Sequence, residues 1–556
     1  MYPAHGPKFP SASPFPVYNY FAYATYYFSH YIVCIDPHPP SVYYSGGLCG
    51  TRNIQHINIL SYRTMELGSI VDFLENKVIL ITGATGFLAK IFVEKILRVQ
   101  PNVKKLYLLI RAPDTESALQ RFNTEAVAKD LFKLLKETHG ENLQKFLSEK
   151  VTPVAGDITY EDMGIQDSTL KEEMWRDIDV VVNVAASTNF DERYDVALPL
   201  NTFGARHVMN FAKKCVDIKL FLHVSTAYVS GEKPGLMLET PYHLGESLNG
   251  TTGLDIDQER KIIEEKLKEL KCDDNANEKS IKISMKDLGM ERANHYGWPN
   301  TYVFTKAMGE MIIGHLKGDM PVVILRPTIV TSTYKEPFPG WVEGIRTIDS
   351  LALGYGKGRL TCFLGDPQAV YDVVPADMVV NAMIVAIAAH ANQTFSETIY
   401  HVGSSVSNPL KFTRIQKSGY LYFTEHPWIE KDGTPVVVGE VTVLKSMASF
   451  HRYVALRYLL PLQVLWFINL LFCQAFASTY KNVKRKINFV LRLVDLYEPY
   501  LFTKSFYDDM NTEKLRRAVR DSGDEEKYFY FDPRVIDWED YFQHTHLPGV
   551  VKHEFK

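Results

Sequence analysis

Two residues with acid–base chemistry, Tyr302 and Lys306, stand four positions apart in the sequence. Residues four apart lie on the same face of a helix, so a helix here would bring the lysine ammonium near the tyrosine phenol. A nearby positive charge lowers the pKa of a phenol, which is about 10 in a free tyrosine. We therefore expect Tyr302 to give its proton to a substrate oxygen, although such pairs also arise by chance on surface helices.

Two hydroxyl residues, Ser225 and Thr226, follow the apolar segment 219–224, which predicts a buried strand. A hydroxyl at a strand end is placed to donate to the same substrate oxygen and to stabilise negative charge that develops there. We expect Thr226 to take this part, with Ser225 as the second candidate. The alternative is a turn in which these hydroxyls cap the backbone.

A glycine turn at Gly83 and Gly86 directly follows the apolar run 78–81. The run predicts a buried strand, and residues 87–99 have the spacing of a helix. Gly83 permits a tight turn, Gly86 permits close approach of a diphosphate, and the free N–H groups of the helix start would face the phosphates. On its own this pattern also fits an ordinary strand–helix connection. Together with the tyrosine–lysine pair, it indicates an enzyme that uses a nicotinamide cofactor.

The next predicted strand, 105–110, ends at Arg111. An acidic residue at this place binds the ribose hydroxyls of NAD in dinucleotide-binding folds, whereas a cation suits the 2′-phosphate of NADP. We therefore expect NADP(H), the alternative being that Arg111 is a solvated loop residue.

Three further strand ends fit the same sheet. Asp157 ends one apolar segment and is expected beside the adenine, while Asn183 lies in the buried run 178–186, whose small residues leave room for a ligand. Packing alone would also explain both segments. A later buried strand, 322–330, contains an Arg-Pro-Thr sequence from Arg326, which we expect near the nicotinamide.

These segments, in this order, resemble the extended short-chain dehydrogenases/reductases, and within them the plant alcohol-forming fatty acyl-CoA reductases, which include the male-sterility-type proteins. The resemblance covers residues 65–556 and rests on the segments 81–90, 183–194, 223–233, 296–306, 326–328 and 503–514. It implies an α/β fold, with a Rossmann-type doubly wound parallel sheet and a smaller, mainly helical C-terminal domain. It also implies NADPH-dependent four-electron reduction of a long-chain or very-long-chain acyl-CoA to a primary alcohol and free CoA, through a bound aldehyde.

The resemblance assigns site residues without any metal. The expected catalytic residues are Tyr302, Lys306, Thr226 and Ser225. The residues expected to bind the cofactor are Gly83, Thr85, Gly86, Phe87, Leu88, Arg111, Asp157, Ile158, Asn183, Ala185, Lys306, Pro327 and Thr328. Three alternatives are a reduction that stops at the aldehyde, a related sterol dehydrogenase or sugar epimerase, and a non-catalytic NADP(H)-binding protein at a membrane.

The chain divides by composition into a leader and a main part. Residues 1–64 are rich in aromatic residues and proline, with very few charges, and we expect a disordered leader. The expected reductase domain spans 65–405, and the expected C-terminal domain spans 406–556. Within the reductase domain, residues 250–292 form a charged insertion that we expect to be solvated; the less favoured alternative is that it forms a lid over the substrate cleft. The net charge of −4 gives no sign of nucleic-acid binding, and six scattered cysteines suggest a reducing compartment.

An uncharged segment, 458–480, lies between basic residues and is near the length that spans a bilayer. Pro461, Gln463 and Asn469 argue against a simple span, so we expect an interfacial or hairpin-like anchor, or alternatively a buried helix. By resemblance, we expect association with the cytosolic face of the endoplasmic reticulum membrane, with plastid or cytoplasm as alternatives. The oligomeric state is open.

Overall fold

The computed structural model describes residues 67–554 except positions 232, 273–276, 361, 392–396 and 473, and the side chains of 489 and 524. The chain from Arg63 to Lys556 forms one compact unit. The expected leader, 1–64, lies outside the described residues. The expected boundary between 405 and 406 stays a prediction.

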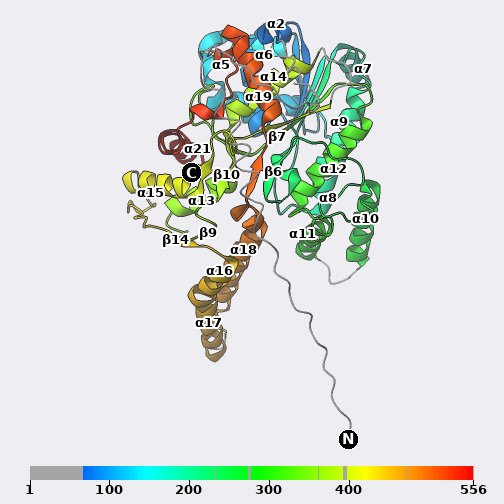
Figure 1. Cartoon of the computed structure of the whole chain (residues 1–556). Helices are drawn as coiled ribbons and strands as arrows, with labels where there is room; N and C mark the ends of the chain where they lie inside the picture. Colours follow the sequence, from blue (N-terminus) through cyan, green and yellow to red (C-terminus); the bar gives the residue numbers. More distant parts are fainter. Residues whose placement is uncertain are drawn as a thin grey trace, which may run out of the picture. The chain divides into compact units, whose positions relative to one another are not determined.

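A seven-stranded, fully parallel sheet forms the centre of this unit (Figure 1). Its strands lie in the order β12-β7-β5-β4-β1-β2-β3. Their bounds are β1 Val78–Thr82, β2 Lys105–Ile110, β3 Val151–Ala155, β4 Val180–Asn183, β5 Leu220–Val224, β7 Val322–Pro327 and β12 Glu397–Val402. The chain order reverses between β1 and β4, and such a switch point is where doubly wound sheets bind ligands. The expected fold class is confirmed.

Both faces of the sheet are covered, as the unbroken apolar runs predict. Ile79 and Ile81 of β1 pack into a large cluster with α3, Phe87–Val99, and α14, Ala376–His390. Val78 and Leu80 point to the opposite face and a second cluster. That cluster contains residues of α7 Ser168–Asp177, α9 Gly204–Ala212 and α12 Thr301–Leu316. Figure 1 shows α9 and α12 side by side.

The strand expected at 322–330 is in fact two strands. β7 ends at Pro327, and β8, Ile329–Thr331, leaves the main sheet to pair with β11, Val373–Pro375. The chain turns at Thr328, whose N–H donates to Val402 O and whose hydroxyl donates to Asp372 at 2.9 Å. This bend carries Pro327 and Thr328 to the carboxyl edge of the sheet.

The charged insertion forms two helices, α10 Ile256–Cys272 and α11 Glu278–His295. The charge pattern of residues 258–270 predicts a solvated helix, and α10 extends slightly beyond both ends of this segment. Glu259 of α10 is buried, pairs with Arg292 of α11 at 2.6 Å and accepts a hydrogen bond from Tyr194 at 2.9 Å. The insertion is thus attached to the main core rather than only solvated.

The C-terminal region contains a helical hairpin, followed by a short strand that pairs outside the central sheet. A continuous helix runs over Met447–Leu471 and includes α16 Met447–Val454 and α17 Leu460–Leu471. The chain then turns into α18, Ala477–Leu501, which contacts α17. The uncharged segment 458–480 is therefore not one helix. Beyond it, β15 Ser505–Tyr507 pairs with β6 Gly235–Met237.

Further helices contribute buried residues to the cluster that contains α3 and α14. The other helices of eight or more residues are α4 Thr115–Phe122, α6 Leu143–Lys150, α13 Thr347–Gly356, α15 Phe412–Glu425, α19 Met510–Asp521 and α21 Leu547–Glu554.

Candidate active site

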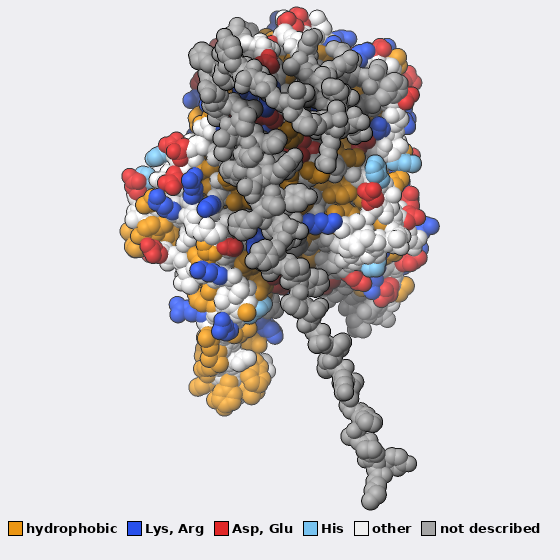
Figure 2. Space-filling view, viewed as in Figure 1, with side chains coloured by type: hydrophobic (Ala, Val, Ile, Leu, Met, Phe, Trp, Pro, Cys, Tyr) orange, Lys and Arg blue, Asp and Glu red, His pale blue; other side chains and the backbone are white. Residues whose placement is uncertain are grey.

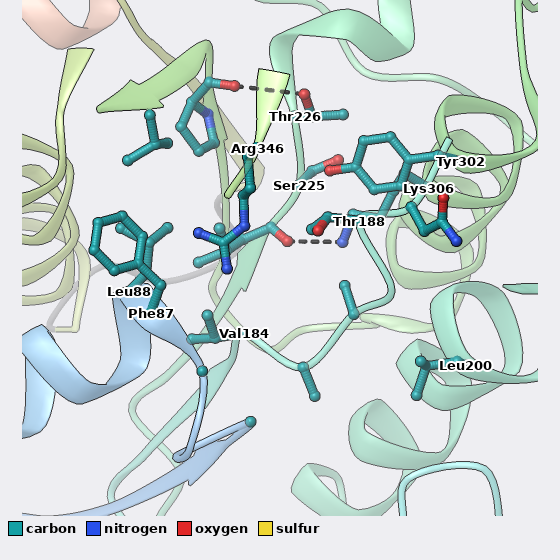
Figure 3. A pocket seen from close by; sticks show the side chains of 18 of the residues that line it. Phe87, Leu88, Val184, Thr188, Leu200, Ser225, Thr226, Tyr302, Lys306 and Arg346 are labelled. Carbon is teal, nitrogen blue, oxygen red and sulfur yellow. Dashed lines mark hydrogen bonds between the residues drawn. The ribbon is translucent and has the colours of Figure 1, made fainter. Parts of the chain in front are cut away.

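A cavity of about 760 Å³ lies along the carboxyl edge of the central sheet. It brings together nearly all the residues that the sequence predicts, as Figure 3 shows for several of them. Its lining includes Gly83, Thr85, Gly86, Phe87, Leu88, Arg111, Asp157, Ile158, Ala185, Ser225, Thr226, Tyr302, Lys306, Pro327 and Thr328. The expected residue that does not line it is Asn183. One cavity therefore contains both the glycine turn and the tyrosine–lysine pair.

The glycine turn leaves space for a dinucleotide because no side chain fits at Gly83. Gly83 has φ of +69°, and a Cβ there would lie 2.8 Å from the Cα of Ala185. Gly86 begins α3 and gives it no side-chain cap, so the first N–H groups of the helix stay available for an anion. The backbone of this turn therefore offers both space and donors for a diphosphate.

Arg111 and Asp157 lie together at the outer end of the cavity. The Nε of Arg111 is 3.0 Å from a carboxylate oxygen of Asp157, and the Arg111 side chain is 65% exposed. Such an exposed pair contributes little to stability, so little stabilisation is lost when the arginine turns toward a phosphate. The pair is placed where the second ribose of a dinucleotide would lie.

Tyr302 and Lys306 stand in the first two turns of α12. Asn300 caps this helix by accepting a hydrogen bond from the Val303 N–H at 3.1 Å. The Lys306 ammonium donates to the Val224 carbonyl oxygen at 2.7 Å and lies 3.3 Å from His223 Nε2. The lysine is therefore held against the end of β5.

The pKa values differ from the sequence expectation. Burial raises the pKa of Tyr302 to about 12, and the interaction with Thr226 and the charge of Arg346 only partly oppose this shift. Burial likewise lowers the pKa of Lys306 to about 8, against the effect of Glu310. The expectation that Lys306 lowers the phenol pKa is wrong for this structure, because desolvation dominates and the ammonium is directed at Val224 and His223. A neutral phenol suits proton donation.

The two candidate hydroxyls have different partners. Thr226 accepts a hydrogen bond from the Tyr228 N–H at 3.3 Å, and its own hydroxyl lies 3.5 Å from the Pro327 carbonyl oxygen. Ser225 Oγ is buried and has no hydrogen-bond partner in the described structure, although the residue lines the cavity. A buried unpaired hydroxyl is costly unless a ligand pairs with it, so Ser225 becomes as strong a candidate as Thr226.

Two predicted positions point elsewhere. The Asn183 side chain accepts from Thr82 at 2.7 Å and lies 3.1 Å from His223 Nδ1. Asn183 therefore braces two strands instead of lining the cavity. The Arg326 guanidinium is buried and pairs with Glu310 at 2.5 Å, so of the Arg-Pro-Thr sequence only the proline and threonine face the cavity.

Sequence reasoning missed an aromatic wall beside the tyrosine. Phe190 stacks on Tyr302 with ring centroids 5.6 Å apart, and Tyr497 and Tyr500 of α18 pack against Phe190 at 5.4 Å each. Leu493 and Leu496 of α18 also line the cavity. The segment 183–194 singled out by the resemblance contains Phe190, but nothing in the sequence signals the approach of α18. The cavity thus has an apolar side next to the proton donor.

Solved structures confirm the fold. The terminal R domain of the myxalamid biosynthetic pathway has a TM-score of 0.52 at 16% identity and covers 86% of this chain and 92% of its own. The R domain of a Mycobacterium tuberculosis non-ribosomal peptide synthetase has a TM-score of 0.51 at 17% identity, with 86% and 90% covered. The sheet, the glycine turn and the tyrosine–lysine pair define the class: an extended short-chain dehydrogenase/reductase that uses a nicotinamide cofactor.

Sequence relatives define the family within this class. Residues 81–383 and 457–556 match two family models, each described as male sterility protein. The chain is 60% identical over 489 residues to the alcohol-forming fatty acyl-CoA reductase of Simmondsia chinensis, covering 88% of this chain and 99% of that protein. It is 53% identical to fatty acyl-CoA reductase 1 of Arabidopsis thaliana, with 87% and 99% covered. The chain belongs to this male sterility protein family of fatty acyl-CoA reductases, as the resemblance implies.

Proposed function

We propose that this protein reduces long-chain or very-long-chain acyl-CoA to primary fatty alcohol and free CoA, with NADPH as reductant. The observation that carries the proposal is the single cavity that joins the glycine turn to Tyr302, Lys306 and the hydroxyls of Ser225 and Thr226. The substrate class follows the relatives. One of them, covered over 99% of its length, is named alcohol-forming fatty acyl-CoA reductase.

The side chains supply the acid and the oxyanion contacts of such a reduction. When bound, the reduced cofactor supplies a hydride to the carbonyl carbon. Tyr302 donates its proton to the carbonyl oxygen, and the Ser225 hydroxyl, which has no other partner, donates a hydrogen bond to the same oxygen as negative charge develops there. The resulting hemithioacetal releases the CoA thiol and leaves an aldehyde.

The same residues serve the second reduction. A second NADPH would replace the oxidised cofactor and supply the second hydride, and Tyr302 regains a proton from solvent. The aldehyde carbonyl then takes the position of the thioester carbonyl, Tyr302 again protonates the oxygen, and the product is a primary alcohol. The apolar wall formed by Phe190, Leu493 and Leu496 gives the acyl chain a surface to contact. Binding energy from the chain is then available to keep the aldehyde in place between the two steps.

Product analysis tests this function. The full chain is incubated with NADPH and acyl-CoAs of graded length, and lipids are identified by gas chromatography while NADPH oxidation and thiol release are counted. The proposal expects alcohol, with two NADPH oxidised per CoA released. If the product is aldehyde, with one NADPH oxidised per CoA released, the enzyme carries out the two-electron reaction instead. If no acyl-CoA gives a product, the proposed function is overturned.

Arg111 supports NADPH as the cofactor. Its side chain is largely exposed at the cavity end and paired only with Asp157 within the described residues. We expect Arg111→Ala to raise the Kd for NADPH by about tenfold, because it removes a charged contact to the 2′-phosphate, and to leave the Kd for NADH nearly unchanged. Fluorescence titration with both cofactors measures the effect, and equal losses would refute the assignment.

We also propose that the protein associates with a membrane surface, at the cytosolic face of the endoplasmic reticulum. The helix Met447–Leu471 is long and apolar enough to cross a membrane, by length and composition. Trp466, Phe467 and Leu471 are each more than half exposed, and Figure 2 shows hydrophobic side chains gathered at this end of the unit. Exposed basic residues at 481 and 484–486 follow on α18. This arrangement suits an amphipathic anchor that meets anionic lipid.

A further inference from the structure

Arg346 lines the cavity at a position that no motif indicates. It directly precedes α13, and its guanidinium carbon lies 5.2 Å from the ring centroid of Phe87, the first residue of α3. Phe87 in turn stacks on Trp341 with ring centroids 5.3 Å apart. Figure 3 shows Arg346 extending into the space between Phe87 and Ser225. The aromatic face orients the planar guanidinium without neutralising its charge.

Arg346 is an exposed cavity cation that pairs with no carboxylate among the described residues, whereas the other cavity cation without a carboxylate partner, Lys306, is buried against β5. Four cationic side chains line the cavity, namely Arg111, Arg121, Lys306 and Arg346. The first is paired with Asp157 and the second with Glu125, while the buried lysine donates to Val224 O. Arg346 donates only to the Glu343 carbonyl oxygen at 3.1 Å, and no carboxylate in the described part of the chain lies within ion-pair distance of it.

The charge of Arg346 also acts on the cavity interior. Its positive charge favours a lower pKa of Tyr302, against the larger effect of burial. A free guanidinium that faces a nucleotide cavity therefore has the position and charge for an anionic ligand. The uncapped N-terminus of α3 lies directly beside it, at Phe87, and favours the same kind of ligand.

We propose that Arg346 binds a phosphate group of a nucleotide in this cavity, belonging either to the diphosphate of the cofactor or to coenzyme A. The inference rests on the proposed function, since both nucleotides are its reactants. The planar fork of a guanidinium matches phosphate oxygens, and Phe87 fixes the plane of the fork. The α3 N–H groups and Arg346 then hold the anion from two sides.

Arg346→Gln and Arg346→Lys test the proposal in the full chain, with Arg359→Gln as matched control. Arg359 is an exposed cation just beyond the other end of α13 and does not line the cavity. The Kd for NADPH is measured by fluorescence without substrate. In addition, kcat/KM is compared for hexadecanoyl-CoA and for the hexadecanoyl thioester of pantetheine, which lacks every phosphate.

If the cofactor supplies the phosphate, Arg346→Gln raises the NADPH Kd about tenfold or more, and lysine restores part of the affinity. If coenzyme A supplies the phosphate, the NADPH Kd is unchanged, and only hexadecanoyl-CoA loses about tenfold in kcat/KM. An unchanged NADPH Kd without a selective loss against hexadecanoyl-CoA overturns the proposal, including when the wild type turns over neither thioester. If the proposed function itself is wrong, the wild type forms no alcohol. The NADPH titration does not depend on alcohol formation, so it still tests whether Arg346 binds the cofactor.

Discussion

Tyr302 is the residue on which the proposed chemistry depends most. It lies in the cavity with a raised pKa, so it is protonated throughout the neutral range and available as a donor. We expect Tyr302→Phe to lower kcat by about 10²- to 10⁴-fold, the usual contribution of a general acid, with the NADPH Kd nearly unchanged. Tyr160→Phe is the matched control, because Tyr160 is an exposed tyrosine outside the cavity. Normal turnover by Tyr302→Phe would assign the acid to another residue.

The pKa of Lys306 predicts a reaction rate that depends on pH. Its pKa is lowered to about 8, so the ammonium loses its proton within the range of an ordinary assay. We expect kcat to fall as the pH rises through about 8, because the neutral amine no longer provides a positive charge beside the cofactor site. A pH–rate profile measures this, and a flat profile up to pH 10 would contradict it.

The lowered pKa of Lys306 also makes the free energy of unfolding depend on pH. The folded-state pKa of Lys306 lies below its unfolded value, so folding opposes the charged form. Between about pH 8 and 10.5 the unfolded chain binds more protons than the folded chain, and the contribution of Lys306 to the free energy of unfolding therefore rises with pH. Below pH 8 this contribution is constant and unfavourable. The lysine is thus a group whose position costs stability.

At the scale of elements, the hairpin of α17 and α18 combines an exposed apolar helix with a wall of the active site. Asn469 at its tip accepts a hydrogen bond from the Phe476 N–H at 2.8 Å, so its amide oxygen is paired within the hairpin. Asn469 therefore counts less against a simple membrane span than its sequence position suggests. At the other end of α18, Tyr500 accepts a hydrogen bond from Asn300, the cap of the catalytic helix, at 2.8 Å.

Charged substitutions on α17 test the proposed membrane contact. We expect the double variant Trp466→Glu with Phe467→Glu to bind vesicles of phosphatidylcholine and phosphatidylserine at least about tenfold more weakly, because burial of two aromatic side chains is lost. Val437→Glu is the control, since Val437 is 89% exposed and lies outside the hairpin. Flotation with vesicles measures binding. If the double variant floats with vesicles as the wild type does, α17 does not make the membrane contact.

At the scale of the whole molecule, the C-terminal residues share a core with the nucleotide-binding part. Trp538 and Tyr541 belong to the same buried cluster as β1 and α3. The Tyr541 hydroxyl donates to the Ser332 carbonyl oxygen at 2.7 Å, and the Trp538 Nε1 donates to Asn408 O at 2.9 Å. These contacts join segments that are far apart in the sequence.

We therefore expect Trp538→Ala to lower the free energy of unfolding by about 3–5 kcal/mol, the usual cost of truncating a buried tryptophan. Because the core is shared, circular dichroism and loss of NADPH binding should report one coincident transition in urea. Trp466→Ala, at a half-exposed tryptophan, is the control with a small effect. Two separate transitions would instead support independent domains divided near residue 405.

The sequence by itself determined the sheet, the glycine turn and the tyrosine–lysine pair that we propose for catalysis. Continuous apolar runs identify buried strands, and Gly83 and Tyr302 stand in short segments whose geometry is set by neighbouring residues. These features depend on contacts within a few positions, so a linear pattern encodes them. The family resemblance then indicated the substrate class.

Only the tertiary structure decided how the side chains are partnered. Among the described residues, the Ser225 hydroxyl has no hydrogen-bond partner, while Thr226 lies against Pro327, about a hundred positions away, and Asn183 is held between Thr82 and His223. The pKa of Tyr302 depends on burial by many segments, and the charge of Arg346 depends on the absence of a carboxylate beside it in the described part of the chain. Such properties arise from long-range packing and desolvation, which residue spacing does not specify.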